Sequence, residues 1–183
     1  MTCIIGYIDR ENKKILISGD SAGVNKYMLY HRKDSKIFIR EPFIMGFTGS
    51  FRMGQLLMAD DRFSIRIQKK DETNIQYMIS AFIPSIQKLF SDGGYLEIIN
   101  DVKHGGEFIV GYHGTLYRIE SDFQVSEYLE DYCACGCGEE IALGSLFTSE
   151  VKDIKEKILI AMKAAEHYST IVSSPFEILE MNY

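Results

Sequence analysis

The stretch TCIIGYIDRENKKILISGD, residues 2–20, decides the fold of this chain. Residues 3–8 and 14–20 form two mostly apolar runs, and the segment between them is polar. Two such runs around a short polar turn predict a β-hairpin. Bulky apolar side chains occupy both faces of both runs. The hairpin is therefore expected to lie in a sheet that is buried on both sides, by helices or by another sheet.

Further strands and helices follow in blocks along the chain. Strands are expected at 36–39, 42–47, 107–112, 115–119, 124–128, 132–137 and 176–179, and helices at 50–58, from Thr73 onward, at 139–146 and at 149–168. Alternating strands and helices would predict a parallel sheet. The blocked order instead predicts two antiparallel sheets stacked face to face, each covered by helices on its outer side.

The helix that begins at Thr73 has two sequence features that define it. Thr73 is the expected N-cap, and Pro84 is expected to kink or split the helix. Its predicted buried face consists of apolar residues at helical spacing, namely Ile75, Ile79, Phe82, Ile86 and Leu89.

Composition narrows the class of protein. The 183 residues carry 46% hydrophobic residues and a net charge of -6, without a linker or repeat, which is typical of a single globular domain spanning 1–183. The acidic balance argues against a nucleic-acid partner. Without a membrane-length apolar run or a basic segment leading into an apolar one near Met1, no membrane partner is expected and the expected location is the cytoplasm.

Five short blocks of this sequence resemble those of the N-terminal-nucleophile (Ntn) hydrolases, specifically proteasome β subunits and the HslV-like peptidases. The blocks lie in the order of that family, at residues 2–6, 18–23, 35–38, 46–50 and 136–144. The resemblance implies an α+β fold, a four-layer αββα sandwich of two stacked antiparallel sheets. It also implies a cytoplasmic threonine protease that forms a homo-oligomeric ring. The start of the chain at Met1-Thr2 favours the HslV-like arrangement, in which loss of Met1 uncovers the nucleophile.

The resemblance assigns roles to individual residues. Thr2 is the implied nucleophile, and its own α-amine, free only after Met1 is removed, is the implied base. Lys36 would lie beside the Thr2 hydroxyl, and Asp20 would keep Lys36 charged and oriented. The Gly49 N–H would stabilise the oxyanion.

Other positions follow or depart from the family pattern. Phe47 and Gly23 are expected to bind the substrate. Cys137 occupies the place of a serine that would hydrogen-bond the amine, and a thiol is a weaker hydrogen-bonding group. Residues 169–174 contain no aspartate where the family often has one, and Ser173 is the nearest match to the accompanying serine.

Neither a cofactor nor a metal ion is expected. Cys133, Cys135 and Cys137 alternate along a predicted strand, so their thiols would face one way. A line of sulfur atoms does not match tetrahedral coordination. Small, buried and inert cysteines are the preferred interpretation, although a soft metal remains the alternative.

Three functions stay open at this stage. The first is a threonine peptidase that cleaves peptides or unfolded proteins, with an ATP-dependent unfoldase as a partner implied by the resemblance alone. The second is a catalytically weak or inactive ring or scaffold subunit. The third is an Ntn amidase that acts on small amides, because fold alone does not fix function.

Overall fold

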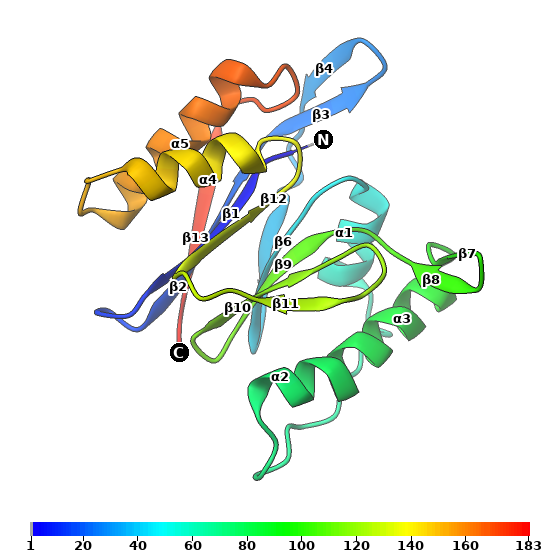
Figure 1. Cartoon of the computed structure of the whole chain (residues 1–183). Coiled ribbons are helices and arrows are strands. Elements are labelled where there is room, and N and C mark those ends of the chain that lie inside the picture. The colour runs from blue at the N-terminus through cyan, green and yellow to red at the C-terminus, as the bar shows by residue number, and fades with distance from the viewer. Residues whose placement is uncertain (1) are drawn as a thin grey trace.

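The N-terminal hairpin forms the middle of a four-stranded sheet in the computed structural model, which describes residues 2–183 (Figure 1). Its strands are β1 (Ile4–Asp9) and β2 (Lys14–Asp20). The strand β12 (Tyr132–Cys135) pairs with β1, and β13 (Phe176–Asn182) pairs with β2. The order is β12-β1-β2-β13, and all pairs are antiparallel.

A second sheet has five antiparallel strands. In sequence order they are β5 (Ile37–Arg40), β6 (Phe43–Phe47), β9 (Phe108–Tyr112), β10 (Thr115–Ile119) and β11 (Val125–Glu127). Their order in the sheet is β11-β10-β9-β6-β5. Each of the predicted strands is therefore present, with the last one extending three residues further, to Asn182.

Helices cover the outer face of each sheet, which completes the predicted four-layer αββα sandwich (Figure 1). The four-stranded sheet is covered by α4 (Glu139–Thr148) and α5 (Ile154–Tyr168). The five-stranded sheet is covered by α1 (Phe51–Ala59), α2 (Asn74–Tyr77), the π-helical segment η1 (Met78–Phe82) and α3 (Ile83–Asp92).

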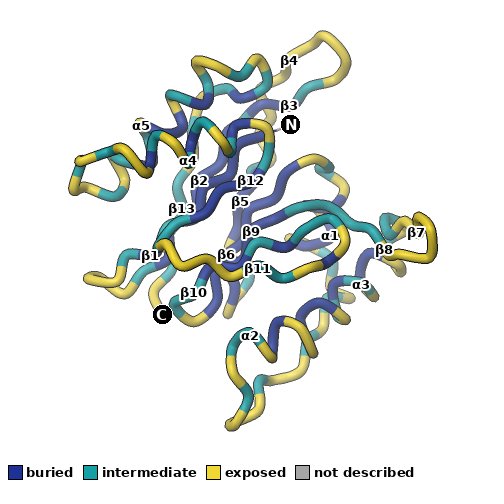
Figure 2. Tube along the Cα trace, in the orientation of Figure 1, coloured by how far each residue is buried: buried dark blue, intermediate teal, exposed yellow. Residues whose placement is uncertain are grey.

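Three apolar clusters fill the spaces between the four layers, and the buried backbone follows the two sheets (Figure 2). Alternation along β1 explains the arrangement. Ile4 and Ile8 point into the cluster between the sheets, whereas Cys3 and Ile5 point into the cluster beneath α4 and α5. Both faces of β1 therefore pack against an apolar layer, as predicted from the apolar residues on both faces of residues 2–20.

The long helix departs from ideal geometry just before Pro84. A capping box on Thr73 opens α2 as predicted, but residues 78–82 form a π-helical turn before α3 begins. Pro84 lacks an N–H and would crowd the Ser80 carbonyl of a regular helix. The wider turn shifts the buried face, so the prediction that Ile79 is buried is wrong: Ile79 is exposed and its neighbour Met78 is fully buried.

The last helix begins later than expected. Residues 149–153 are not helical, and α5 starts at Ile154 because the Asp153 side chain caps the Glu156 N–H at 2.7 Å. The side of α5 that faces the four-stranded sheet contains Ile158, Met162 and Ala165, which are buried. Two short hairpins were not predicted: β3 (Ala22–Asn25) with β4 (Met28–His31), and β7 (Glu97–Ile99) with β8 (Val102–His104). No helix within residues 2–183 combines the length and apolar character needed to cross a membrane.

Candidate active site

Thr2 lies at the entrance to β1 and is only 2% exposed. The first hairpin pairs Ile4 with Gly19, which sets the start of β1 beside the end of β2. Asp20 therefore faces the backbone of the N-terminal residues, and its Oδ1 accepts the Cys3 N–H at 3.0 Å. Met1, whose removal the sequence predicts, lies outside the described residues.

Asp20 is the centre of a buried polar cluster. The same Oδ1 that accepts the Cys3 N–H also accepts Lys36 Nζ at 2.9 Å. Its Oδ2 accepts the N–H groups of Ala22 at 3.0 Å and of Ser173 at 3.4 Å. A carboxylate buried this deeply needs several donors to offset the loss of hydration. The four donors come from the start of β1, the first residue of β3, the segment before β5 and the loop after α5. Asp20 therefore holds these four segments together.

The Lys36–Asp20 ion pair is almost fully shielded from solvent, with side-chain exposures of 2% and 0%. Burial lowers the pKa of Lys36, and the pairing with Asp20 opposes that shift. The lysine is thus a desolvated amine with one carboxylate partner, held next to the backbone of residues 2 and 3. Such a group exerts a stronger field on its surroundings than a solvated lysine.

The turn from β12 into α4 encloses Thr2 from the other side. Gly136 adopts a φ of 96°, and a Cβ at this position would lie 2.4 Å from the Thr2 carbonyl oxygen. The Gly138 N–H donates to the same oxygen at 3.3 Å. Glycine at 136 is therefore required both by backbone conformation and by the close approach of Thr2.

Cys137 lies between these two glycines, beyond the end of β12, and is exposed. Its two neighbours, Gly136 and Gly138, both approach the Thr2 carbonyl oxygen, which places Cys137 beside the cluster. The prediction that its thiol shares a face with Cys133 and Cys135 is wrong. Those two are buried between the sheets, whereas Gly136 turns the chain before Cys137. Within residues 2–183 no three His, Cys, Asp or Glu side chains group as metal ligands would.

A cavity of about 520 Å³ opens next to this cluster. One end is lined by Thr48, Gly49, Gly136 and Cys137. Gly49 has a φ of 79°, and among the hydrogen bonds of residues 2–183 its N–H has no acceptor. The next residue, Ser50, caps α1, so the positive end of that helix dipole is directed to the same place.

The far wall of the cavity is a charged network that sequence inspection missed. Arg118 on β10 forms ion pairs with Glu107, Glu120 and Glu139, at 3.3, 3.1 and 3.1 Å. Burial disfavours the charged form of Arg118, but the carboxylates, led by Glu139, keep its pKa above the ordinary value. Burial and the neighbouring carboxylates raise the pKa of Glu120. Glu107 and Glu120 lie near Arg118 in the sequence and on neighbouring parts of the five-stranded sheet, whereas Glu139 reaches Arg118 only because β10 packs against β12 and the start of α4.

The two predicted substrate-binding residues lie away from this cavity. The Phe47 ring is buried beneath α1, where a Cβ on Gly54 would lie 2.1 Å from it. Gly23 is in β3 and packs against the Arg32 side chain. The structure therefore brings together Thr2, Asp20, Lys36, Gly49 and Cys137 and leaves Phe47 and Gly23 outside that group. It also adds Ser173, whose N–H bonds Asp20 and whose Oγ lies 3.1 Å from His31 Nε2.

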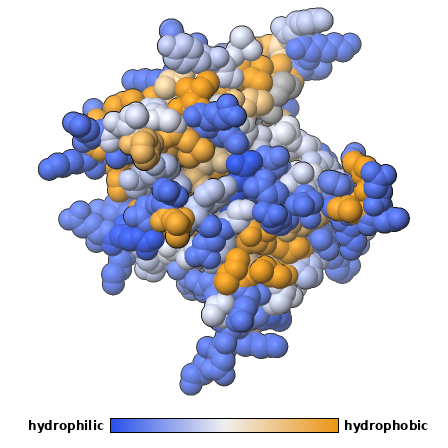
Figure 3. Space-filling view, viewed as in Figure 1, coloured by the Kyte–Doolittle hydropathy of each residue, from blue (hydrophilic) through white to orange (hydrophobic). Residues whose placement is uncertain are grey.

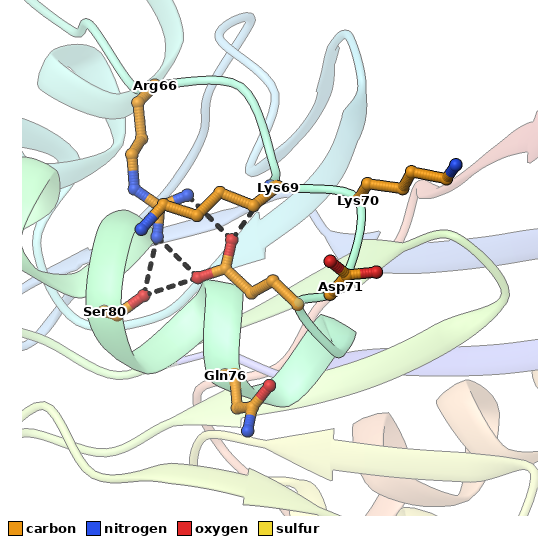
Figure 4. A pocket seen from close by; sticks show the side chains of 7 residues that line it. Arg66, Lys69, Lys70, Asp71, Gln76 and Ser80 are labelled. Carbon is orange, nitrogen blue, oxygen red and sulfur yellow. Dashed lines mark hydrogen bonds and ion pairs between the residues drawn. The ribbon is translucent and has the colours of Figure 1, made fainter.

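A larger hollow, of about 610 Å³, lies in the loop before α2 (Figure 4). Here Glu72 is held by Arg66 and Ser80, and the hydrogen bonds from Arg66 lower the pKa of Glu72 to about 2. Lys69 and Lys70 line the same hollow, and Lys70 extends away from the ion pair. The loop is a solvated polar surface and contains none of the predicted site residues.

The thiols provide a test of this arrangement. Burial raises the pKa of Cys3 and of Cys133 to about 12 and raises that of Cys135 well above its ordinary value, so all three stay protonated and unreactive. We expect an aromatic disulfide reagent to modify one thiol rapidly in the native protein and all four in denaturant. Cys137→Ser should remove the fast reaction. Rapid modification of two or more native thiols would contradict the burial of the others.

Comparison with known proteins gives matches at the level of structure. No protein-family model and no curated protein sequence matches this chain. Thiobacillus denitrificans BPH in complex with epoxomicin superimposes with a TM-score of 0.78 at 15% identity, covering 99% of this chain and 98% of the other. HslV from Trypanosoma brucei gives 0.67 at 13% identity, covering 100% of both chains. The Anbu (Gly-1) mutant from Hyphomicrobium sp. strain MC1 gives 0.69 at 12% identity, covering 100% of this chain and 82% of the other.

At sequence identities this low, structural similarity establishes the fold, and the chemistry has to be argued from the residues of the site. TM-scores of 0.67 to 0.78 with 99–100% of this chain covered show that the chain shares its αββα sandwich fold with BPH, HslV and Anbu, which are proteasome-like Ntn-hydrolase proteins.

Proposed function

We propose that this protein is a threonine peptidase whose nucleophile is Thr2, exposed as the N-terminal residue once Met1 is removed. One observation carries the proposal. A single buried oxygen, Asp20 Oδ1, binds both the Cys3 N–H and the Lys36 amine, which fixes the backbone of residue 2 next to a desolvated cation.

The reaction would begin with a proton transfer from the Thr2 hydroxyl to its own α-amine. A free α-amine titrates at about 7.7–8.0, close to working pH, which suits a general base. The hydroxyl oxygen would then attack the substrate carbonyl carbon. The α-ammonium would return the proton to the leaving amine, so that the peptide bond breaks and an ester to Thr2 remains. Water would cleave that ester by the same base.

The surrounding groups have separate parts in this scheme. Lys36, kept charged by Asp20, would stabilise the developing alkoxide of Thr2. The Gly49 N–H, at the positive end of α1, would donate to the oxyanion in the adjoining cavity. Cys137 would take the place of the family serine beside the amine, and a weaker hydrogen bond there would slow proton transfer.

Assembly and partners complete the proposal. A peptide or an unfolded protein would be the substrate, enclosed by a homo-oligomeric ring, and an ATP-dependent unfoldase would deliver it. The fold shared with HslV supports the ring and the partner by likeness only.

The intact mass of the purified protein, before and after incubation with epoxomicin, tests the proposal. Epoxomicin is the compound in the BPH complex, and its epoxyketone reacts with a hydroxyl and a neighbouring free amine. We expect loss of Met1 and a single adduct that maps to Thr2. A chain that has lost Met1 and takes no adduct would overturn the proposal. A chain that retains Met1 is first trimmed with methionine aminopeptidase and then probed.

A non-enzymatic ring subunit is the second candidate, favoured by two observations. The thiol of Cys137 replaces a hydroxyl, and residues 169–174 supply no aspartate to orient the amine. This candidate is supported if the trimmed protein takes no adduct and Thr2→Ala leaves both assembly and every measured activity unchanged.

A further inference from the structure

The β3–β4 hairpin projects beyond the body of the molecule (Figure 1). It forms a two-stranded sheet of its own, with a tight turn at Lys26 and Tyr27. An isolated two-stranded ribbon is only marginally stable in water. This one nevertheless presents a run of large exposed side chains, with Tyr27 at 103% exposure, followed by Met28, Leu29 and Tyr30.

The base of the hairpin is anchored, whereas its tip is not. Arg32 forms a two-pronged ion pair with Asp34 at 2.7 and 2.6 Å and stacks on the Phe51 ring, 3.9 Å from its centre. The hairpin is therefore held in a defined direction at its root, and its apolar tip is offered to solvent. Such a tip is suited to enter a recess on another molecule.

The same chain carries an apolar recess elsewhere on its surface. A cavity of about 240 Å³ lies between β12, the preceding segment and α4, with lining residues Tyr128, Glu130, Tyr132, Cys133, Ala134, Leu143 and Phe147. Phe147 is 81% exposed and the nearby Leu129 is fully exposed. Apolar side chains gather over the α4 side of the molecule in Figure 3, and Figure 1 shows the hairpin projecting from a different side.

The charges around the two surfaces are opposite. The hairpin is flanked by the exposed Lys26 and Lys33, and the recess by the exposed Glu127 and Glu130. Within residues 2–183 none of these four side chains takes part in an ion pair. The hairpin thus carries Lys26 at its apolar tip and Lys33 beside its root, whereas two acidic side chains border the recess, and complementary charges favour association and fix its register.

We infer that the β3–β4 hairpin of one copy of this chain docks into the β12–α4 recess of the next copy. The two surfaces are different, so the contact is head-to-tail, and repetition of such a contact gives a ring when the rotation closes. The inference deepens the assembly part of the proposed function by naming the surfaces involved. It does not depend on the chemistry at Thr2.

The docked hairpin has a direct bearing on the candidate active site. It is inserted between Asp20 and Lys36, the two members of the buried ion pair. Ser21 at its start donates its N–H to the Ser173 carbonyl at 3.1 Å, and Arg32 at its end donates to the Ser21 carbonyl at 3.2 Å. A neighbour that holds the tip would therefore steady both ends of the Asp20–Lys36 segment.

Charge reversal tests the contact. One variant carries Lys26→Glu and Lys33→Glu, and the other carries Glu127→Lys and Glu130→Lys. We expect the wild type to form a multi-copy assembly in sedimentation velocity and native mass spectrometry. In either variant alone the affinity between copies should fall roughly tenfold or more, because the hairpin and the recess then carry charges of the same sign. An equimolar mixture should restore assembly, since each hairpin then meets a recess of opposite charge.

Controls separate this result from misfolding and from changes in net charge. Far-UV circular dichroism and the melting temperature of each variant establish folding. Lys69→Glu with Lys70→Glu changes the net charge as much as the hairpin variant does, at the loop of Figure 4, and should assemble like the wild type. The inference is overturned if wild type stays monomeric, if both variants assemble normally, or if folded variants fail to assemble when mixed. Epoxomicin labelling of Thr2 is read separately, so failure of the contact and failure of the peptidase proposal are distinguishable.

Discussion

Thr2→Ala is expected to abolish peptide cleavage, with kcat/KM falling by roughly 10³-fold or more, the scale of loss when a hydrolase loses its nucleophile. The alanine variant has the same backbone and still allows Met1 to be removed, but it lacks the hydroxyl that attacks the substrate. The rate is measured with a set of fluorogenic peptides on protein whose N-terminus has been verified by intact mass.

Two further variants are the controls for Thr2→Ala. Thr2→Ser keeps a hydroxyl at the same place and should retain most of the activity. Thr115→Ala removes a hydroxyl at the start of β10, far from the N-terminus in Figure 1, and should leave the activity unchanged. Peptide cleavage by Thr2→Ala at the rate of the wild type would refute the role of Thr2.

Asp20→Ala is expected to lower the free energy of unfolding by about 3–5 kcal/mol, the usual cost of leaving one charge of a buried pair without its partner. The substitution strips Lys36 of its carboxylate and also removes the acceptor for the N–H groups of Cys3, Ala22 and Ser173. Urea or guanidinium unfolding, monitored by circular dichroism, measures the change. Epoxomicin labelling of Thr2 should be lost as well, because the start of β1 is no longer held beside Lys36.

An exposed pair is the matched control for that experiment. Asp92→Ala removes the carboxylate that Lys88 contacts, in a pair whose side chains are 75% and 38% exposed. Exposed pairs contribute only about 0–1 kcal/mol, so the unfolding free energy should change little. The double variant Asp20→Asn/Lys36→Met removes both buried charges together and should be more stable than Asp20→Ala. Equal effects of Asp20→Ala and Asp92→Ala would show that burial of the Asp20 pair contributes nothing.

The sequence determined most of the secondary structure and the layered architecture. Strands such as β1 and β2 carry apolar residues on both faces, and a chain can satisfy such strands only by covering both sides of the sheet. The blocked order of strands and helices then limited the choice to stacked antiparallel sheets. Family likeness in short motifs pointed to Thr2, Asp20, Lys36, Gly49 and Cys137. In the structure Asp20 and Lys36 form a buried cluster at the start of β1, and Gly49 and Cys137 line the adjoining cavity.

Tertiary structure decided what pattern could not encode. The π-turn before Pro84 contains Ile79, which is exposed while Met78 is buried in its place, whereas Phe82, Ile86 and Leu89 are buried as predicted. Asp20 binds Cys3, Lys36 and Ser173, and Arg118 binds Glu139, although each of these partners is more than a dozen positions away in the sequence. Such contacts depend on how the strands and layers pack. Likewise, alternation assigned Cys137 to the face of Cys133, but the positive φ of Gly136 redirected it. Local sequence sets which surface of each element is buried; the packing of the layers decides which distant side chains meet.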